Sequence, residues 1–190
     1  MPVARAFARC ILLGAIAAPA AAIAQEKGDA GITMGYPASI GFVYHVTDRF
    51  AIRPEVSLAI SSGKSESQVS TTEGDTFSIG VGISGILYLR QWDKLRTYFT
   101  PRYTYNHGES TTSSSFSLPF PDTTESTQTS NLHSLVGAFG AQVAVHDRFS
   151  VFGEVGAGYS HQRSRSELSG LKSTTNQFAT RTAVGVILYF

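Results

Sequence analysis

Strict alternation of apolar with small or polar residues recurs along most of this chain and constrains its fold more than any other feature. In residues 50–60 the even positions carry apolar side chains or proline, and the odd positions carry Ala, Arg, Glu and Ser. The same period of two recurs in residues 76–84, 95–106 and 177–190. Successive side chains of a β-strand point to opposite faces, so this period predicts strands, and no sustained helical period accompanies it. The chain is therefore predicted to be all-β.

An internal repeat marks two of the expected turns. Residues 46–56 and 145–155 share the pattern V-x-D-R-F-x-[IV]-x-x-E-V at a constant offset (145 − 46 = 99). Each copy is predicted to be a strand, a tight turn around the aspartate and a second strand, because a short Asp side chain can bond nearby backbone amides. A third short turn is expected at residues 92–94. Longer polar connections, expected as loops at the opposite end, occupy residues 61–75, 107–130 and 161–176.

Counting the alternating segments tests whether the sheet can close. Seven strands are plain, and the short segment 29–36 supplies an eighth, because its apolar residues alternate with small or polar ones before Pro37. An odd number would leave the two chain ends at opposite ends of an up-and-down sheet. We therefore predict an eight-stranded antiparallel up-and-down barrel. The seven plain strands are residues 39–47, 49–61, 76–90, 94–107, 131–146, 148–161 and 176–190.

Two prolines lie inside the predicted strands, at Pro54 and Pro101. Proline removes a hydrogen bond from the strand ladder, and a closed barrel has no free edge to accommodate it. We expect a local bulge at each proline, or strand limits that are shifted by a residue or two.

The composition of the two faces favours a barrel that spans a membrane. Charged residues make up 15% of the chain, whereas about 25% is usual for a soluble domain. A soluble barrel that binds lipid inside would show water a face rich in Lys and Glu. Here the polar face carries mainly Gly, Ser, Ala and Thr, which suit a narrow interior, so the apolar face is expected to meet lipid. A secreted, soluble lipid-binding barrel, with the faces reversed, and a β-sandwich remain as alternatives.

The aromatic residues of the apolar face are expected to form two girdles with aliphatic residues between them, as at the two interfaces of a membrane barrel. The girdle near the short turns would contain Tyr44, Phe50, Phe149 and Phe190. The girdle near the long loops would contain Tyr36, Phe77, Tyr103, Tyr105, Tyr159 and Phe178.

The N-terminus has the features of a secretory signal peptide. Two arginines precede an apolar run at residues 11–22, and a small-x-small cleavage site follows at residues 22–24. We predict a signal peptide at residues 1–24 and a barrel domain at residues 25–190. Cys10, the only cysteine, would be removed with the signal, which leaves no disulfide, thiolate nucleophile or cysteine metal ligand.

Five charged residues fall on the face assigned to the barrel interior: Arg53, Glu55, Arg102, Glu154 and Arg181. A charge in a low-dielectric interior is tolerated when it is paired, so we expect an ionic network centred on Glu55, Glu154, Arg102 and Arg181. The network could gate a polar path for ions, or it could fill the barrel as a structural plug. Eight strands leave an interior just wide enough for side chains, which favours the plug.

The polar connections offer surfaces for contact but no catalytic motif. Residues 107–130 contain 13 Ser or Thr in 24 positions, which fits either a surface-contact loop or a solvated one. Arg163 and Arg165 could meet lipopolysaccharide phosphates, whose geometry guanidinium groups match. No cluster has metal-ligand spacing, no glycine-rich phosphate loop is present, and no motif joins the histidines to serines. We therefore expect no enzymatic activity, no metal and no cofactor. The net charge of +1 without a basic stripe does not indicate nucleic-acid binding.

The signal peptide, the alternating strands, the V-x-D-R-F turns and the final strand at residues 183–190 together resemble the small bacterial outer-membrane β-barrels typified by the OmpA membrane domain and OmpX. The resemblance implies a location in the cell outer membrane, with short turns in the periplasm and long loops outside. It also implies that Phe190 and Leu188 form a signal for the barrel-assembly machinery. The implied partners are outer-membrane lipids, lipopolysaccharide and an unknown surface partner at the loops. The implied role is structural or surface-interacting and non-enzymatic, with a narrow porin-like channel as the alternative.

Overall fold

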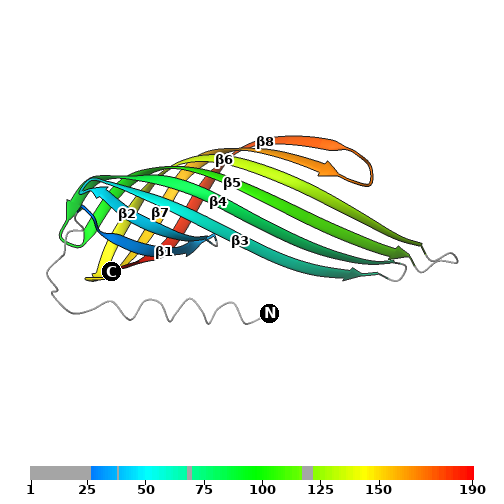
Figure 1. Cartoon of the computed structure of the whole chain (residues 1–190), viewed down its shortest axis with the longest axis horizontal. Coiled ribbons are helices and arrows are strands. Elements are labelled where there is room, and N and C mark those ends of the chain that lie inside the picture. The colour runs from blue at the N-terminus through cyan, green and yellow to red at the C-terminus, as the bar shows by residue number, and fades with distance from the viewer. Residues whose placement is uncertain (1–26, 38, 68–69, 117–121) are drawn as a thin grey trace.

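Eight antiparallel strands, joined in chain order, form a closed barrel in which β8 pairs back onto β1 (Figure 1). This computed structural model describes residues 27–37, 39–67, 70–116 and 122–190. The predicted all-β, eight-stranded up-and-down barrel is confirmed. The predicted signal peptide lies outside the described residues. The strands are β1 (Ala30–Tyr36), β2 (Ser39–Thr47), β3 (Phe50–Glu66), β4 (Ser70–Trp92), β5 (Leu95–Phe116), β6 (Asp122–His146), β7 (Phe149–Ser166) and β8 (Lys172–Tyr189).

The three short turns share one construction. Each follows a one-residue register shift, at Val46 on β2, Leu89 on β4 and Val145 on β6. One residue pair separates the shift from the turn on β2 and on β6, and three pairs separate them on β4. An extra residue in one strand of a pair increases the local twist and bends the strand. Val46 and Val145 are equivalent positions of the internal repeat. The repeat therefore encodes the shift as well as the turn that follows it.

The two prolines leave the strand register intact, so the predicted bulges are wrong. Pro54 pairs with Ile83, and Pro101 pairs with Gly137, in ladders that show no shift at these positions. On its other side each proline coincides with a gap in the ladder, and the same register resumes beyond the gap. Each proline therefore interrupts the residue pairing with one neighbouring strand, but it does not change the register.

Most of the residues expected in long loops are strand residues instead. β3 to β8 continue past the limits set by hydrophobic alternation, and residue pairing reaches Glu66 with Thr71 and Arg165 with Lys172. Polar pairs support these extensions, such as Thr76 and Ser110, whose hydroxyl oxygens lie 3.1 Å apart. Threonine is β-branched and favours strands, so a segment rich in Ser and Thr can form a ladder without an apolar face.

The first two strands are much shorter than the others. β1 has 7 residues and β2 has 9, whereas β4, β5 and β6 have 23, 22 and 25. β2 pairs with β3 up to Val56, and β1 pairs with β8 up to Val184. Beyond these residues the described pairings join only β3 to β8, as an extended sheet that leaves the closed ring on the side away from the short turns, to the right in Figure 1. We use "above" for the direction along the barrel axis toward this sheet.

The pleat separates an apolar outer face from a packed inner one. Large apolar side chains of the outer face are exposed, with Ile60 and Phe178 each 75% accessible, while Val43 and Ala51 of the inner face are 0% accessible. All ten aromatics predicted for the girdles lie on the outer face, as the alternation with buried neighbours shows. Their arrangement as two rings at membrane interfaces stays a prediction.

Candidate functional site: the barrel interior

Packed side chains fill the interior near the short turns. Gln142 bridges two tyrosines there: Tyr88 donates a hydrogen bond to its Oε1 (3.3 Å), and its amide nitrogen donates one to the Tyr189 hydroxyl (3.1 Å). The His45 ring stacks on the Tyr88 ring with centroids 5.5 Å apart. This part of the barrel holds a hydrophobic core rather than a wide lumen. Its buried members are Val43, Ala51, Ile86, Tyr88, Tyr98, Phe152, Ile187 and Tyr189.

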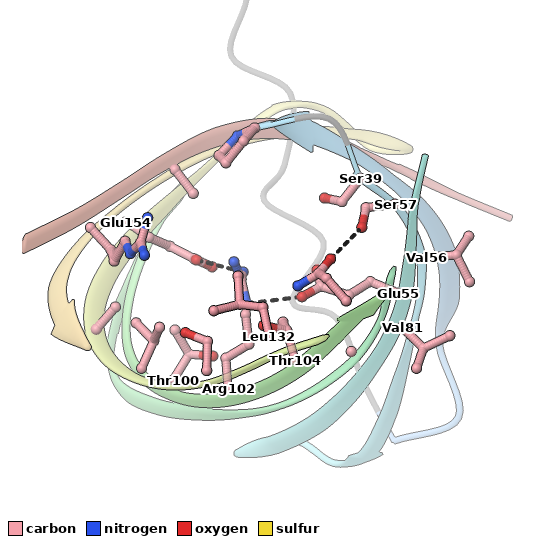
Figure 2. Close-up of a pocket in the computed structure, with 18 of the residues that line it drawn as sticks. Ser39, Glu55, Val56, Ser57, Val81, Thr100, Arg102, Thr104, Leu132 and Glu154 are labelled. Atoms are coloured by element: carbon pink, nitrogen blue, oxygen red, sulfur yellow. Dashed lines mark hydrogen bonds and ion pairs between the residues drawn. The ribbon is translucent and has the colours of Figure 1, made fainter. Parts of the chain in front are cut away.

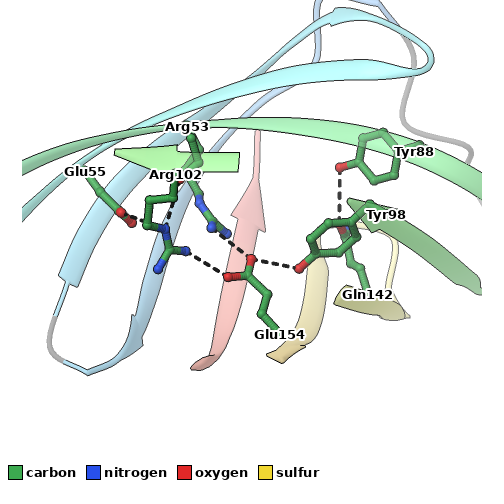
Figure 3. A network of polar contacts seen from close by, with 8 residues as sticks. Arg53, Glu55, Tyr88, Tyr98, Arg102, Gln142 and Glu154 are labelled. Carbon is green, nitrogen blue, oxygen red and sulfur yellow. Dashed lines mark hydrogen bonds and ion pairs between the residues drawn. The ribbon is translucent and has the colours of Figure 1, made fainter. Parts of the chain in front are cut away.

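A layer of paired charges lies above this core, and Glu154 is its centre (Figure 3). Arg53 and Arg102 each donate an Nη2 hydrogen bond to a different carboxylate oxygen of Glu154, both at 2.8 Å. The Tyr98 hydroxyl donates a third at 3.0 Å. The Nε of Arg102 lies 3.0 Å from Glu55 Oε1. We call Arg53, Glu55, Arg102 and Glu154 the charge layer.

The charge layer is deeply buried and electrically balanced. The side chains of Arg53 and Glu154 are 1% and 3% accessible, and those of Glu55 and Arg102 are 8% and 18%. Two arginines face two glutamates, so the formal charge is zero. The four residues come from the alternate strands β3, β5 and β7. The layer therefore ties these strands together across the lumen.

Arg181, which the sequence placed in the same network, is not brought into it. Arg181 forms no ion pair with any residue that the structure describes, and its side chain is exposed. The strand register explains the difference: Ala183 pairs opposite Glu154, whereas Arg181 pairs opposite Gly156, two residues farther toward the extended sheet. Arg53 pairs with Glu154 instead.

Above the charge layer the interior opens into a cavity of about 250 Å³ (Figure 2). Its floor includes Glu55, Arg102 and Glu154, and Arg181 contributes to its wall. The Ser57 hydroxyl donates a hydrogen bond to Asn106 Oδ1 at 3.3 Å, over Gly80. A Cβ at Gly80 would overlap both of these side chains, so glycine is needed beneath this contact. The remaining wall is formed mostly by hydroxyl-bearing and aliphatic side chains.

The outer face carries a band without formal charge. On β3 no Asp, Glu, Lys or Arg faces outward between Phe50 and Ile60, and the same holds for residues 77–89 of β4 and 149–161 of β7. The outward residues of β1 and β2 are also uncharged. Eleven residues (50–60) at about 3.3 Å each, tilted by about 45°, span roughly 25 Å.

Two polar clusters, which sequence reasoning missed, mark the upper edge of this band. In Tyr-x-His at residues 105–107, the tyrosine donates to Asn131 Oδ1 at 2.8 Å, and the histidine Nδ1 lies 2.8 Å from the same oxygen. The segment 159–161 repeats the arrangement with Asn176, at 2.9 and 2.7 Å. The recurrence of Tyr-x-His was the available signal in the sequence. Charged residues on the outer face of β5 and β7 begin only beyond these clusters, at Glu109 and Arg163.

The two residues predicted as an assembly signal lie at the seam where the ring closes. Leu188 pairs with Ile32 of β1 and faces outward, 53% accessible. The Phe190 amide donates to the Ala30 carbonyl at 3.2 Å, and its ring lies 6.2 Å from that of Phe42. Their role in assembly stays a prediction.

The described residues contain neither a metal centre nor a membrane-spanning helix. No group of three or more His, Cys, Asp or Glu side chains there could hold a metal ion. The described segments also contain no helix with the length and hydrophobicity needed to cross a membrane.

Comparison with solved structures identifies the fold. A major outer membrane protein of Thermus thermophilus matches with a TM-score of 0.53 and 11% identity over 85% of this chain and 98% of that one. CarO of Acinetobacter baumannii matches with a TM-score of 0.45 and 16% identity, over 85% of this chain and 97% of that one. Ail, the attachment invasion locus protein of Yersinia pestis, gives 0.44 and 14%, over 87% of this chain and 100% of that one. No family model and no curated protein matches the sequence. The predicted similarity to small outer-membrane β-barrels is confirmed as a similarity of fold.

Proposed function

We propose that this chain is an integral protein of the bacterial outer membrane, with a plugged barrel and a surface sheet that contacts partners outside the cell. The observation that carries the proposal is the uncharged outer band. A membrane barrel needs an apolar band about 25 Å tall, and the band on β3 to β8 has that height. In water, the same exposed apolar surface would greatly exceed the few hundred Å² that soluble monomers tolerate.

The packed interior supports a structural role rather than transport. The core around Gln142 and the charge layer lie in series along the barrel axis, and both consist of buried side chains. An ion would have to displace both layers to cross. The alternative, a narrow channel, draws support from the cavity, which reaches down to Arg102 and Glu154.

The extended sheet is the part proposed to contact partners. It continues β3 to β8 beyond the Tyr-x-His clusters, so it would stand outside the membrane with the short turns in the periplasm. Its outer face carries separate charged groups, acidic at Glu109 and basic at Arg163 and Arg165. The proposed partners are lipopolysaccharide and an unidentified surface ligand.

The proposal includes export and assembly. Residues 1–24 would act as the signal peptide, residues 25–190 would form the mature protein, and the final strand ending in Phe190 would be read by the barrel-assembly machinery. No enzymatic activity is proposed. The histidines at 107, 133 and 161 contact tyrosine or asparagine side chains, and none of their described hydrogen bonds is to a serine.

Membrane fractionation combined with heat-modified gel mobility tests the proposal. A folded barrel stays compact in detergent until it is boiled, because its backbone groups are paired in a closed ladder. We expect the native protein in the outer-membrane fraction, with different mobility before and after boiling. A charge in the band, Ile83→Arg, should prevent insertion, while the matched Thr71→Arg, on the same face of β4 but in the extended sheet opposite Glu66, should not. A mature protein found soluble in the periplasm with a single band would overturn the proposal.

A further inference from the structure

Arg181 stands out by its place on the inner face of the barrel. Above the charge layer, the inward side chains described on β3 to β8 are Ser, Thr, Asn, Gln and small or aliphatic residues, apart from this arginine. The charged residues of the extended sheet, such as Glu109 and Arg163, lie at the alternate positions that face outward. Arg181 is therefore the single charged side chain among those described on this inner surface.

The carboxylates nearest to the cavity do not neutralise Arg181. Glu154 is held by Arg53 and Arg102, both at 2.8 Å, and Glu55 by Arg102 at 3.0 Å. These four charges already sum to zero. The guanidinium of Arg181 thus adds one uncompensated positive charge to the cavity wall.

The cavity also presents hydrogen-bond donors that are not engaged. Thr100 lies in its lining, is 1% accessible, and its hydroxyl has no hydrogen-bond partner among the described residues. A buried hydroxyl without a partner carries a cost that a bound polar group would remove. Thr104 and Ser134 bring further hydroxyls to the same cavity. A guanidinium fork together with hydroxyl donors is the set that recognises carboxylate and phosphate oxygens.

The cavity is accessible from the side of the extended sheet. Pro37 and Ser39, at the end of the short β1–β2 hairpin, form part of its lining, and the ring is not closed beyond them in the described pairings. Its volume of about 250 Å³ equals roughly eight water molecules at about 30 Å³ each. A small hydrophilic solute fits this space, whereas a polymer chain does not.

We propose that this cavity binds the oxyanion group of a small solute, a carboxylate or phosphate, with Arg181 as its cationic contact and Thr100 among its hydroxyl donors. The charge layer serves as the floor of the site, and its glutamates stay engaged with their arginines. The site is a property of the folded barrel in detergent, so its test does not depend on where the protein is located in the cell.

Calorimetric titration of the folded, full-length mature barrel with inorganic phosphate tests the site. We expect saturable binding that weakens about ten- to hundredfold in Arg181→Gln, the effect of losing one charged hydrogen-bonding group. Arg148→Gln is the matched control, because it removes an exposed arginine of the short β6–β7 turn, outside the cavity, and should bind as the wild type does. Heat-modified mobility verifies that each variant is folded.

A second titration distinguishes the two sources of phosphate. Binding of inorganic phosphate identifies a free solute, whereas binding of dihexanoylphosphatidate alone identifies a lipid headgroup, and either must weaken in Arg181→Gln. The proposal is overturned if neither probe binds the folded wild type, or if Arg181→Gln binds as tightly as the wild type does.

Discussion

Glu154 is the residue on which the interior depends most, because it accepts hydrogen bonds from Arg53, Arg102 and Tyr98 at once. Glu154→Gln would leave Arg53, with a side chain 1% accessible, buried without its ion-pair partner. Breaking a buried ion pair in this way costs about 3–5 kcal/mol. We expect that loss in the free energy of unfolding, measured by urea titration with the fluorescence of Trp92.

Two variants control this experiment. Glu73→Gln removes an exposed carboxylate of the Lys64 pair and should leave the unfolding transition unchanged. Adding Arg53→Met to Glu154→Gln removes the stranded charge and should restore much of the stability, because an apolar side chain can replace a buried ion. If Glu154→Gln unfolds as the wild type does, the charge layer contributes no net stability.

Gly80 gives a second test at the residue scale. A methyl group there would overlap the Asn106 and Ser57 side chains above it, whereas a methyl group at Gly153 would meet nothing within 4 Å. We expect Gly80→Ala to lower the free energy of unfolding by about 1–3 kcal/mol, the usual cost of overpacking. Gly153→Ala should not be destabilising. Equal unfolding transitions for the two variants would show that the side chains of the cavity wall move aside to accommodate the added methyl group.

At the scale of elements, the extended hairpins should be separable from the closed ring. The described β5–β6 ladder continues without a shift from Leu95 to Phe116, so it can be cut between paired residues. Replacing residues 111–127 by Asn-Gly joins Ser110 to its partner Gln128 with a hairpin turn. We expect heat-modified mobility to persist. Removing β1 and β2 instead should abolish it, because the ring then cannot close, and persistence after that deletion would contradict the role of these strands.

The β3–β4 extension contains an ionic cluster with a predictable pH dependence. Lys64 Nζ lies 2.8 Å from Glu66 and 3.2 Å from Glu73. Its hydrogen bond lowers the pKa of Glu66, and the two glutamates raise the pKa of Lys64. Since the pKa of Glu66 is depressed in the folded state, the pairing is present above its ordinary pKa and is lost as pH falls through the lowered one. Lys64→Gln should raise the pKa of Glu66, as measured by NMR titration of its carboxyl carbon, and an unchanged value would contradict the pairing.

At the scale of the whole molecule, the sequence predicted what depends on local pattern and missed what depends on register between strands. Alternation and the aspartate turns were sufficient for eight strands and for the face of each residue. The strand extensions were not predicted, because Ser and Thr ladders such as that at Thr76 and Ser110 show no hydrophobic period. Arg181 was placed on the correct face but at the wrong position along the barrel axis, because its distance from Glu154 is set by the pairing between β7 and β8. Alternation within one strand contains no information on that offset.

Conductance across a planar bilayer is the measurement that separates the two proposed roles of the barrel as a whole. The core around Tyr88, Gln142 and Tyr189 lies below the charge layer, so removing part of the layer leaves the barrel closed. We therefore expect no unitary current from the wild type and none from Arg102→Ala. In a channel gated by the charge layer, the wild type would show unitary steps, and Arg102→Ala would change their size by altering the charge along the path. Heat-modified mobility of the reconstituted protein must accompany the recordings, because the absence of current is informative only if the reconstituted barrels are folded.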